Sequence, residues 1–394
     1  MKNLSTQQRM RALWLAIATI AAFYLLRHFS KVVLTDGPRG DFDIVMNAAR
    51  RWVSGEAVYR LSDDSEHTKP PLLMALAVPL LSLPREWLRV LWDLLNFALP
   101  FLILRELALE AGGLRGRLRA VAGTVVILAP LWYIEAVYGQ YNLLILWMTL
   151  LAARWASQSG ALSSWASGFC FALTLIIKPT QLFLAPWLLG RALTTQSSAF
   201  RRLGRVALGG VLGILMLAAI YMGMSSWGAL LADHREWLSF IPQSAAKHVL
   251  REDNFGLPTL LVRLGLGEIQ ASPIFLMVGL ALTSWGVWFL RRSSSLSFSL
   301  SLSWSLVLML AFSPMCWRAN FGILLPLVFL LIGLLEQGVR VAWVGVLSLF
   351  ALSRVSPYWL GDAGMITMGK LALPLWLAGL ALWSAVAGTR GQRS

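Results

Sequence analysis

Long apolar runs separated by short polar breaks extend along most of the chain. An α-helix needs roughly 20 apolar residues to cross a bilayer, with a range of about 17–25. The pattern therefore predicts an all-α integral membrane protein with about twelve membrane-spanning helices, several of them short. The predicted spans are 12–30, 87–104, 120–137, 142–156, 163–177, 179–190, 206–223, 272–290, 298–312, 319–335, 341–353 and 368–387.

One further apolar run, from Pro70 to Pro84, is shorter than the others and is bounded by proline. A run of this length is too short to cross a bilayer by itself. We expect it to be re-entrant or to lie at the membrane interface.

Apolar residues in the first polar interval recur at the spacing of a helix. They are Phe42, Val45, Met46, Ala49 and Trp52. This spacing predicts an amphipathic helix that lies on the outer surface of the membrane. Asp41 comes just before its first turn, where a carboxylate can cap the free backbone N–H groups.

Serine alternates with other residues between Ser293 and Ser303, with the period of a β-strand. An isolated strand cannot satisfy its backbone hydrogen bonds in lipid. We therefore predict the start of a helix whose serine hydroxyls bond back to backbone carbonyls.

Composition agrees with a membrane protein. Charged residues make up 13% of the chain and apolar residues 57%, whereas a soluble domain has roughly 25% charged residues. The mean hydropathy is +0.66. A net charge of +15 would suggest nucleic-acid binding in a soluble protein, but in a membrane protein it fixes topology and contacts anionic lipid. We expect the lipid bilayer, and no nucleic acid, as a partner.

The arginine clusters indicate the topology. If the N-terminus is cytoplasmic, the short inward loops and the C-terminal tail hold most of them, which is the positive-inside pattern. These arginines are Arg115, Arg117, Arg119, Arg201, Arg202, Arg205, Arg291, Arg292, Arg390 and Arg393. The two long loops, 31–86 and 224–271, then face outward. We treat residues 1–394 as one polytopic domain in the cytoplasmic (inner) membrane.

Polar residues gather at the outward ends of the predicted spans and in the two long outer loops. The candidate site residues are Asp41, Asp43, Tyr59, His67, Lys69, Gln140, Asn142, Lys178, Asn254, Trp317 and Arg318. Each has an ordinary alternative role: Lys178 could reach lipid headgroups, Trp317 could belong to an aromatic belt, and Gln140 could tie helices together. The topology was derived without these residues, yet all of them fall on the extracytoplasmic face, where we expect the active site.

No cofactor or metal is predicted. The four histidines are scattered at positions 28, 67, 234 and 248, and no cluster of His, Cys and Asp has the spacing of metal ligands. Asp41-Phe42-Asp43 has the DxD pattern of nucleotide-sugar enzymes, in which a metal bridges a diphosphate. Nucleotide sugars are absent outside the cytoplasmic membrane, so this match is weak.

The motifs and their order resemble the GT-C superfamily of glycosyltransferases. Over about 36–335, the chain is similar to the polyprenol-phosphate-mannose-dependent mannosyltransferases of phosphatidylinositol mannoside synthesis (glycosyltransferase family 87). The matching motifs are Asp41-Phe42, Ala48-Ala49-Arg50, Gly55-Glu56, Tyr59, Pro70-Pro71-Leu72, Pro79-Leu80, Leu83-Pro84, Leu91-Trp92, Gly139-Gln140-Tyr141-Asn142, Lys178-Pro179-Thr180, Ser313-Pro314 and Trp317. The chain has Lys69 where the family commonly has an aromatic residue, and Ala319 where a histidine is frequent.

The resemblance implies a GT-C fold and places the catalytic acid/base at Asp41. An inverting transfer of a sugar, mannose, from a polyprenyl-phosphate donor to a lipid or glycan acceptor would follow. Lys178, Arg318 and Lys69 are then candidates to bind the donor phosphate, where fixed positive charge is needed. The remaining candidates would bind the sugar or the acceptor: Asp43, Tyr59, His67, Gln140, Asn142, Asn254 and Trp317.

A twelve-span secondary transporter or a flippase is the alternative. A transporter would have internal repeats and polar groups near the bilayer midplane. Asp93, in the second predicted span, favours a transporter, but a neutral contact with Asn96 one turn later explains it equally well.

Overall fold

The computed structural model describes residues 40–63, 66–110, 118–158, 160–193, 199–249, 251, 253–266, 273–293, 297–355 and 370–391, with isolated positions between 8 and 27 and between 360 and 368. Within these residues every regular element is a helix and no strand is present, as the apolar pattern predicted. The predicted first span, 12–30, lies almost wholly outside the described residues.

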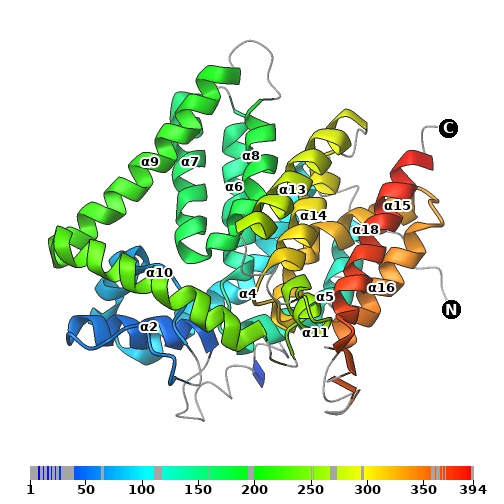
Figure 1. Cartoon of the computed structure of the whole chain (residues 1–394). Helices are drawn as coiled ribbons and strands as arrows, with labels where there is room; N and C mark the ends of the chain where they lie inside the picture. Colours follow the sequence, from blue (N-terminus) through cyan, green and yellow to red (C-terminus); the bar gives the residue numbers. More distant parts are fainter. Residues whose placement is uncertain are drawn as a thin grey trace.

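A bundle of helices forms the body of the molecule (Figure 1). Its helices are α4 (Arg85–Glu110), α5 (Leu118–Val137), α6 (Asn142–Ala156), α7 (Ala161–Ile177), α8 (Ala185–Ala192), α9 (Ala199–Met224), α13 (Pro273–Ser293), α14 (Ser297–Phe312), α15 (Leu325–Glu336), α16 (Ala342–Arg354) and α18 (Leu373–Gly391). Helices α7 and α9 cross closely. A Cβ added to Gly168 would lie only 1.8 Å from the carbonyl oxygen of Val206. Small residues at a crossing allow two membrane helices to approach in this way.

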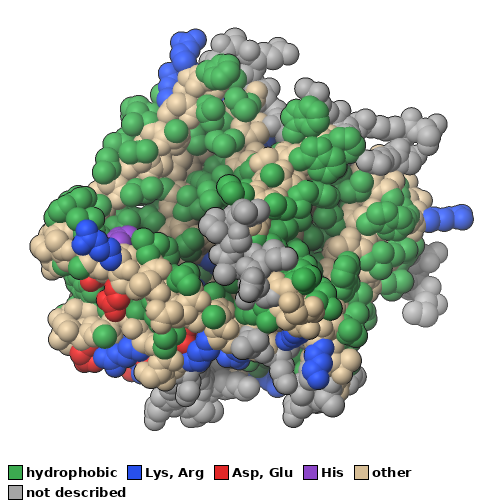
Figure 2. Space-filling model, in the orientation of Figure 1, with side chains coloured by type: hydrophobic (Ala, Val, Ile, Leu, Met, Phe, Trp, Pro, Cys, Tyr) green, Lys and Arg blue, Asp and Glu red, His purple; other side chains and the backbone are tan. Residues whose placement is uncertain are grey.

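Shorter elements lie at the lower end of the bundle in Figure 1, where α10 crosses beneath the upright helices and α2 lies below α10. These elements are α2 (Gly40–Val53), η1 (Pro71–Leu73), α3 (Met74–Ala77), η2 (Val78–Ser82), α10 (Trp227–Val249) and α11 (Leu257–Arg263). They come from the two predicted outer loops, 31–86 and 224–271. Figure 2 shows charged side chains gathered over this end, below a largely hydrophobic surface.

The predicted amphipathic helix is present as α2, but its surroundings differ from the prediction. Phe42, Val45, Met46 and Ala49 are buried and pack against the 72–77 segment and α4. The apolar side of α2 therefore faces the protein. The helix begins at Gly40, so Asp41 lies inside the first turn and does not hold the predicted capping position.

Large apolar side chains project outward from several bundle helices. Examples are Val211, Leu212 and Leu215 on α9, Trp285 and Trp288 on α13, Leu347 and Phe350 on α16, and Trp376 and Trp383 on α18. A soluble monomer rarely exposes so much apolar surface. These outward faces support a membrane protein.

The number of membrane spans stays a prediction. Among the described residues, three helices are long and apolar enough to cross a membrane: 85–110, 199–224 and 318–336. The count rises to four if the pair 123–137 and 142–156, bent by 111°, is one span.

The predicted span 179–190 is not one continuous α-helix. It begins with the 3₁₀ helix η3 (Pro179–Leu184) and continues as α8. Pro179 and Pro186 stand near the starts of these two elements, and proline supplies no backbone N–H for a continuous helical ladder. The predicted span 319–335 likewise begins with a 3₁₀ helix, η4 (Arg318–Leu324), before α15.

The serine-rich run is helical, as predicted, in its described part. The hydroxyls of Ser301, Ser303 and Ser305 donate to the carbonyls of Phe298, Ser299 and Ser301 at 3.2, 2.7 and 3.1 Å. These bonds satisfy the hydroxyls inside an apolar helix, α14.

Asp93 and Asn96 are both buried in α4. The Asn96 amide donates to the carbonyl of Trp92 at 3.1 Å. The hydrogen bond made by this amide therefore runs to the backbone of its own helix.

Candidate active site

The N-terminus of α2 is fixed against the turn between α5 and α6. Gly40 has a φ of +64°, and a Cβ there would lie 1.6 Å from the carbonyl oxygen of Tyr138. The next backbone N–H, from Asp41, donates to that same oxygen at 2.7 Å. Only glycine fits this left-handed, closely approached position. Glycine at position 40 thus fixes the backbone position of Asp41, and with it the position of the Asp41 carboxylate.

Asp41 forms an ion pair with Lys69. The Lys69 Nζ lies 3.3 Å from Asp41 Oδ2, and the two side chains retain 15% and 20% of their exposure. Tyr59 donates its hydroxyl hydrogen to the carbonyl of Lys69 at 3.0 Å, and Tyr141 donates to the carbonyl of Asp41 at 3.4 Å. One tyrosine thus holds the backbone of Lys69 and the other holds the backbone of Asp41. Solvent or substrate can still reach the ion pair between them.

A second lysine lies deeper, at the end of α7. Lys178 Nζ donates to Asn142 Oδ1 at 2.8 Å. Burial lowers the pKa of Lys178, the positive charge of Lys69 lowers it further, and Asp41 and Glu135 oppose the effect. Lys69 and Lys178 thus bring two ammonium groups to this region, together with the carboxylates of Asp41 and Glu135.

Glu135 holds Asn142 in place, and the sequence analysis did not include it. Its Oε2 accepts from Asn142 Nδ2 at 3.0 Å, and its Oε1 accepts from the backbone N–H of Leu143 at 3.1 Å. Asn142 Nδ2 also donates to Asn320 Oδ1 at 3.2 Å. A carboxylate in the last turn of an apolar helix is a signal that could have identified Glu135.

Asp43 contributes to the fold of this region. It is 1% exposed and forms ion pairs with Arg89 and, at 3.3 Å, with Arg85. These contacts tie α2 to α4. Both carboxylates of the DxD pattern are thus engaged by basic side chains, and no group of three His, Cys, Asp or Glu residues suited to a metal occurs in the described part of the chain.

His67 lies within the first predicted outer loop. It is buried, its ring centroid is 5.6 Å from that of Tyr59, and burial and the nearby Lys69 lower its pKa to about 3. His67 is therefore neutral at physiological pH, so it adds no charge beside Lys69.

The second outer loop supports the segment that carries Lys69. Lys247, on α10, contacts Glu66 at 2.7 Å, and His248 contacts the same carboxylate at 3.4 Å. Trp237 donates to the carbonyl of Thr68 at 3.1 Å. Helix α10 thus positions the chain immediately before Lys69.

Trp317 and Arg318 have their described contacts elsewhere. Arg251 lies 4.9 Å above the Trp317 ring, and the His248 ring is 5.7 Å from it. Arg318 donates to the carbonyl of Ser353 at 3.3 Å. Trp317 therefore packs on the second outer loop, and Arg318 reaches toward the end of α16.

Asn254 joins two loops by hydrogen bonds from both the nitrogen and the oxygen of its side-chain amide. Its Nδ2 donates to the carbonyls of His248 and Pro314 at 3.2 and 2.7 Å, and its Oδ1 accepts from the N–H groups of Gly256 and Cys316 at 3.2 and 3.0 Å. It is 0% exposed. Gln140 is also buried, and its backbone N–H donates to the carbonyl of Glu135 at 3.0 Å.

The candidate group therefore consists of the Asp41–Lys69 ion pair and of the hydrogen-bonded residues Glu135, Asn142 and Lys178. The sequence pattern of glycosyltransferase family 87 matches residues 67–314, a range that includes all of this group except Asp41. No curated protein and no solved structure matches the chain. The family match covers well over half of the 394 residues. The chain belongs to glycosyltransferase family 87.

Proposed function

We propose that this glycosyltransferase uses a polyprenyl-phosphate sugar as donor and transfers the sugar, mannose, to a lipid or glycan acceptor with inversion. One observation carries the proposal: the partly exposed Asp41–Lys69 pair lies at the same end of the bundle as the half-buried Lys178, which Asn142 holds. One carboxylate for a proton and two lysines for a phosphate are the groups that this reaction requires.

Asp41 accepts the proton of the acceptor hydroxyl as that oxygen attacks the anomeric carbon. A bond forms between the acceptor oxygen and the anomeric carbon. The bond between this carbon and the phosphate oxygen breaks, and its electron pair leaves with the phosphate. A phosphate is already a good leaving group, so no general acid is required. A single displacement inverts the anomeric centre, and a β-linked donor gives an α-linked product.

Lys69 and Lys178 stabilise the negative charge that develops on the leaving phosphate. Lys69 is bound to Asp41 through a 3.3 Å contact that is partly exposed. An incoming phosphate competes with Asp41 for this ammonium group. When the phosphate binds Lys69, the Asp41 carboxylate is free to act as a base. Donor binding therefore precedes activation of Asp41.

Glu135 and Asn142 are positioning residues for Lys178. The chain of contacts from Glu135 to Asn142 to Lys178 consists of bonds of 3.0 and 2.8 Å. A buried ammonium group in a long flexible side chain needs such partners to hold one geometry. The carboxylate at the far end also offsets part of the cost of burying the charge.

The arginine distribution supports an extracytoplasmic active site in the cytoplasmic membrane. The groups of the candidate site come from the outward side of the predicted topology. A membrane-embedded polyprenyl chain would lie against the apolar side chains that project from the bundle.

The test is transfer from a radiolabelled polyprenyl-phosphate mannose by the purified full-length protein in detergent. The proposal expects a labelled glycolipid or glycan with wild-type protein and almost none with Asp41→Asn. Product from other sugars only would refute mannose as the donor sugar. Gradient-driven uptake by reconstituted vesicles, with no transfer in detergent, would favour the transporter alternative.

A further inference from the structure

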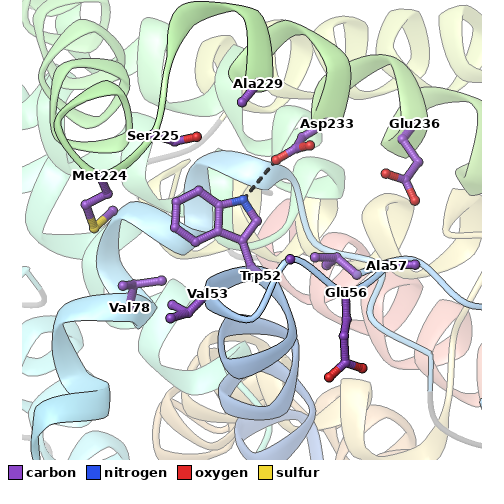
Figure 3. A pocket seen from close by; sticks show the side chains of 12 residues that line it. Trp52, Val53, Glu56, Ala57, Val78, Met224, Ser225, Ala229, Asp233 and Glu236 are labelled. Atoms are coloured by element: carbon purple, nitrogen blue, oxygen red, sulfur yellow. Dashed lines mark hydrogen bonds between the residues drawn. The ribbon is translucent and has the colours of Figure 1, made fainter.

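A cavity lies at the C-terminal end of α2, where that helix meets the junction of α9 and α10 (Figure 3). Its volume is about 560 Å³. Asp41 and Trp52 are eleven residues apart on one helix, which corresponds to roughly 16 Å. The cavity is thus separate from the group around Asp41, although one rigid helix carries residues of both.

Trp52 forms a fixed aromatic wall of this cavity. Its indole N–H donates to Asp233 Oδ2 at 2.9 Å and to the Tyr221 hydroxyl at 2.8 Å. Tyr221, which is fully buried, also donates to Asp233, and its ring packs on that of Trp52 at 5.0 Å. These contacts hold the indole in one orientation, which a binding wall requires.

The charged groups of the cavity are carboxylates, and Ser225 adds a hydroxyl group. Asp233 and Glu236 both project from α10 into the cavity, and the Asp233 carboxylate points to the Trp52 indole (Figure 3). Burial raises the pKa of Glu236, and the nearby Asp233 raises it further. Both carboxylates can only accept hydrogen bonds when ionised, so a ligand must supply hydrogen-bond donors.

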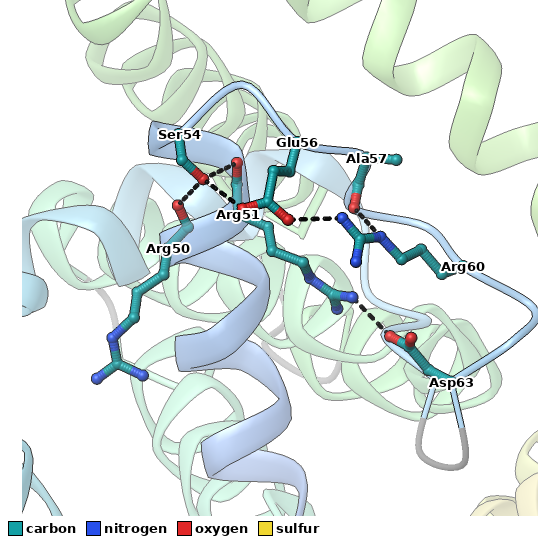
Figure 4. A network of polar contacts seen from close by, with 7 residues as sticks. All are labelled: Arg50, Arg51, Ser54, Glu56, Ala57, Arg60 and Asp63. Atoms are coloured by element: carbon teal, nitrogen blue, oxygen red, sulfur yellow. Dashed lines mark hydrogen bonds and ion pairs between the residues drawn. The ribbon is translucent and has the colours of Figure 1, made fainter.

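The arginines near the cavity already have partners (Figure 4). Arg60 contacts Glu56 at 2.7 Å, and Arg51 contacts Asp63 at 2.6 Å. No lysine or arginine lines the described cavity. A phosphate would therefore meet uncompensated negative charge here, in contrast to the lysine-bearing group around Asp41.

The remaining wall is apolar and includes Val53, Val78 and Met224. An aromatic face, an apolar floor and hydrogen-bond acceptors together fit a molecule that has C–H faces and many hydroxyl groups. We propose that this cavity binds a neutral saccharide, and that the saccharide is a part of the acceptor remote from the reacting hydroxyl. The acceptor role rests on the proposed transferase function, whereas saccharide binding at the cavity does not.

Remote binding of this kind would use acceptor contacts far from the reacting bond to position the attacked hydroxyl. It would also separate the two substrates by charge. The anionic donor would be favoured at Lys69 and Lys178, and the neutral acceptor at Asp233 and Glu236.

Binding is tested on the full-length Asp41→Asn protein in lipid nanodiscs that contain no glycolipid, so that transfer plays no part. The probe is octyl α-mannoside, with octyl phosphate and octylammonium as comparators, titrated by calorimetry. We expect the mannoside to bind and octyl phosphate to bind at least about tenfold more weakly. Tighter binding of octylammonium than of the mannoside, or no mannoside binding, would overturn the proposal.

Variants locate the binding. Trp52→Ala should weaken mannoside binding by about tenfold or more, while Trp227→Ala, which removes an exposed tryptophan of α10 outside the cavity lining, should not. Because Trp52→Ala removes packing, the exposed Glu236 provides a second variant: Glu236→Ala should weaken binding several-fold, and Glu86→Ala should leave it unchanged. Equal effects of the cavity and control variants would refute the site.

The acceptor role is tested separately, in transfer assays with protein that retains Asp41. Glu236→Ala should raise the KM for acceptor several-fold and leave the KM for donor unchanged. If it weakens mannoside binding but leaves acceptor kinetics unchanged, the saccharide is not the acceptor. If no variant of the chain transfers sugar, the proposed function fails while the binding result stands.

Discussion

The Lys69 ammonium lies 3.3 Å from the Asp41 carboxylate, so the proposed base has a cationic partner. In this arrangement the ammonium group occupies the carboxylate that the proposed mechanism uses to accept a proton. Movement of Lys69 to a donor phosphate would remove this restraint. The ion pair thus links the binding of one substrate to the activation of the other.

Replacement of Asp41 by Asn is the most direct test of the base. We expect turnover to fall by roughly two to four orders of magnitude, because an amide cannot accept the proton. Donor binding should change little, and melting temperature should remain near that of wild type, since the side chain keeps its shape. Near-normal turnover would show that Asp41 is not the base.

Asp43→Asn should give the opposite pattern. This carboxylate is 1% exposed and pairs with Arg85 and Arg89, so its loss leaves two partly buried cations without it. We expect a loss of stability of about 1–3 kcal/mol, measured as a lower melting temperature, with a smaller change in turnover per folded molecule. If Asp43→Asn abolishes turnover in a stable protein, Asp43 is the base.

Glu135→Gln tests the support of Lys178. The amide cannot accept both hydrogen bonds that the carboxylate accepts, and it lacks the negative charge near the lysine. We expect kcat/KM for the donor to fall roughly tenfold, the equivalent of a charge-assisted hydrogen bond. Glu336→Gln, at the exposed end of α15, is the matched control. A lower melting temperature with unchanged donor kinetics would indicate a purely structural role.

The sequence predicted the helical character of the chain because apolar runs of helical length have few alternatives in lipid. It also identified α2 and the helical serine run, since both follow from local periodicity and hydroxyl chemistry. It did not predict that η3 and α8 divide the 179–190 run, because the effect of Pro179 and Pro186 depends on how the neighbouring helices accommodate the break.

The sequence proposed candidate site residues, but it could not give their contacts. The charge of Lys69 and Lys178 and their position in the polar breaks between apolar runs are visible in the sequence. Two of the four hydrogen bonds of Asn254, those to Pro314 and Cys316, depend on the approach of chain segments about 60 residues apart. Glu135 was missed because it lies within an apolar run, where only its partners reveal its role.

Single-cysteine labelling tests the topology in intact cells. Ser82 lies in the first predicted outer loop and Arg201 in a predicted inner loop, and both are exposed. The two native cysteines, Cys170 and Cys316, are buried, so the background should be low. An impermeant thiol reagent should label Ser82→Cys and not Arg201→Cys. Equal labelling of both would refute the assigned topology.

Chelation tests whether the lysines act without a metal. A phosphate leaving group that faces Lys69 and Lys178 has less need of a divalent ion than a diphosphate has. We expect transfer to continue at an unchanged rate in excess EDTA. Loss of activity in EDTA that manganese restores would mean that Asp41 and Asp43 bind a metal after all.

The pH dependence of donor binding tests the role of Lys178 specifically. Burial lowers the pKa of this lysine, so its positive charge is lost at a lower pH than that of an ordinary lysine. Because the charged form binds phosphate, KM for the donor should rise as pH increases through the lowered pKa. Lys178→Arg keeps its charge throughout this range and should abolish this alkaline rise, even if its altered shape raises KM overall. Lys178→Ala should weaken donor binding at every pH and slow transfer, since the charge acts in both the ground state and the transition state. An alkaline rise in KM that persists in Lys178→Arg would assign the titration to another group, and Lys69→Arg would then identify whether the exposed lysine is that group.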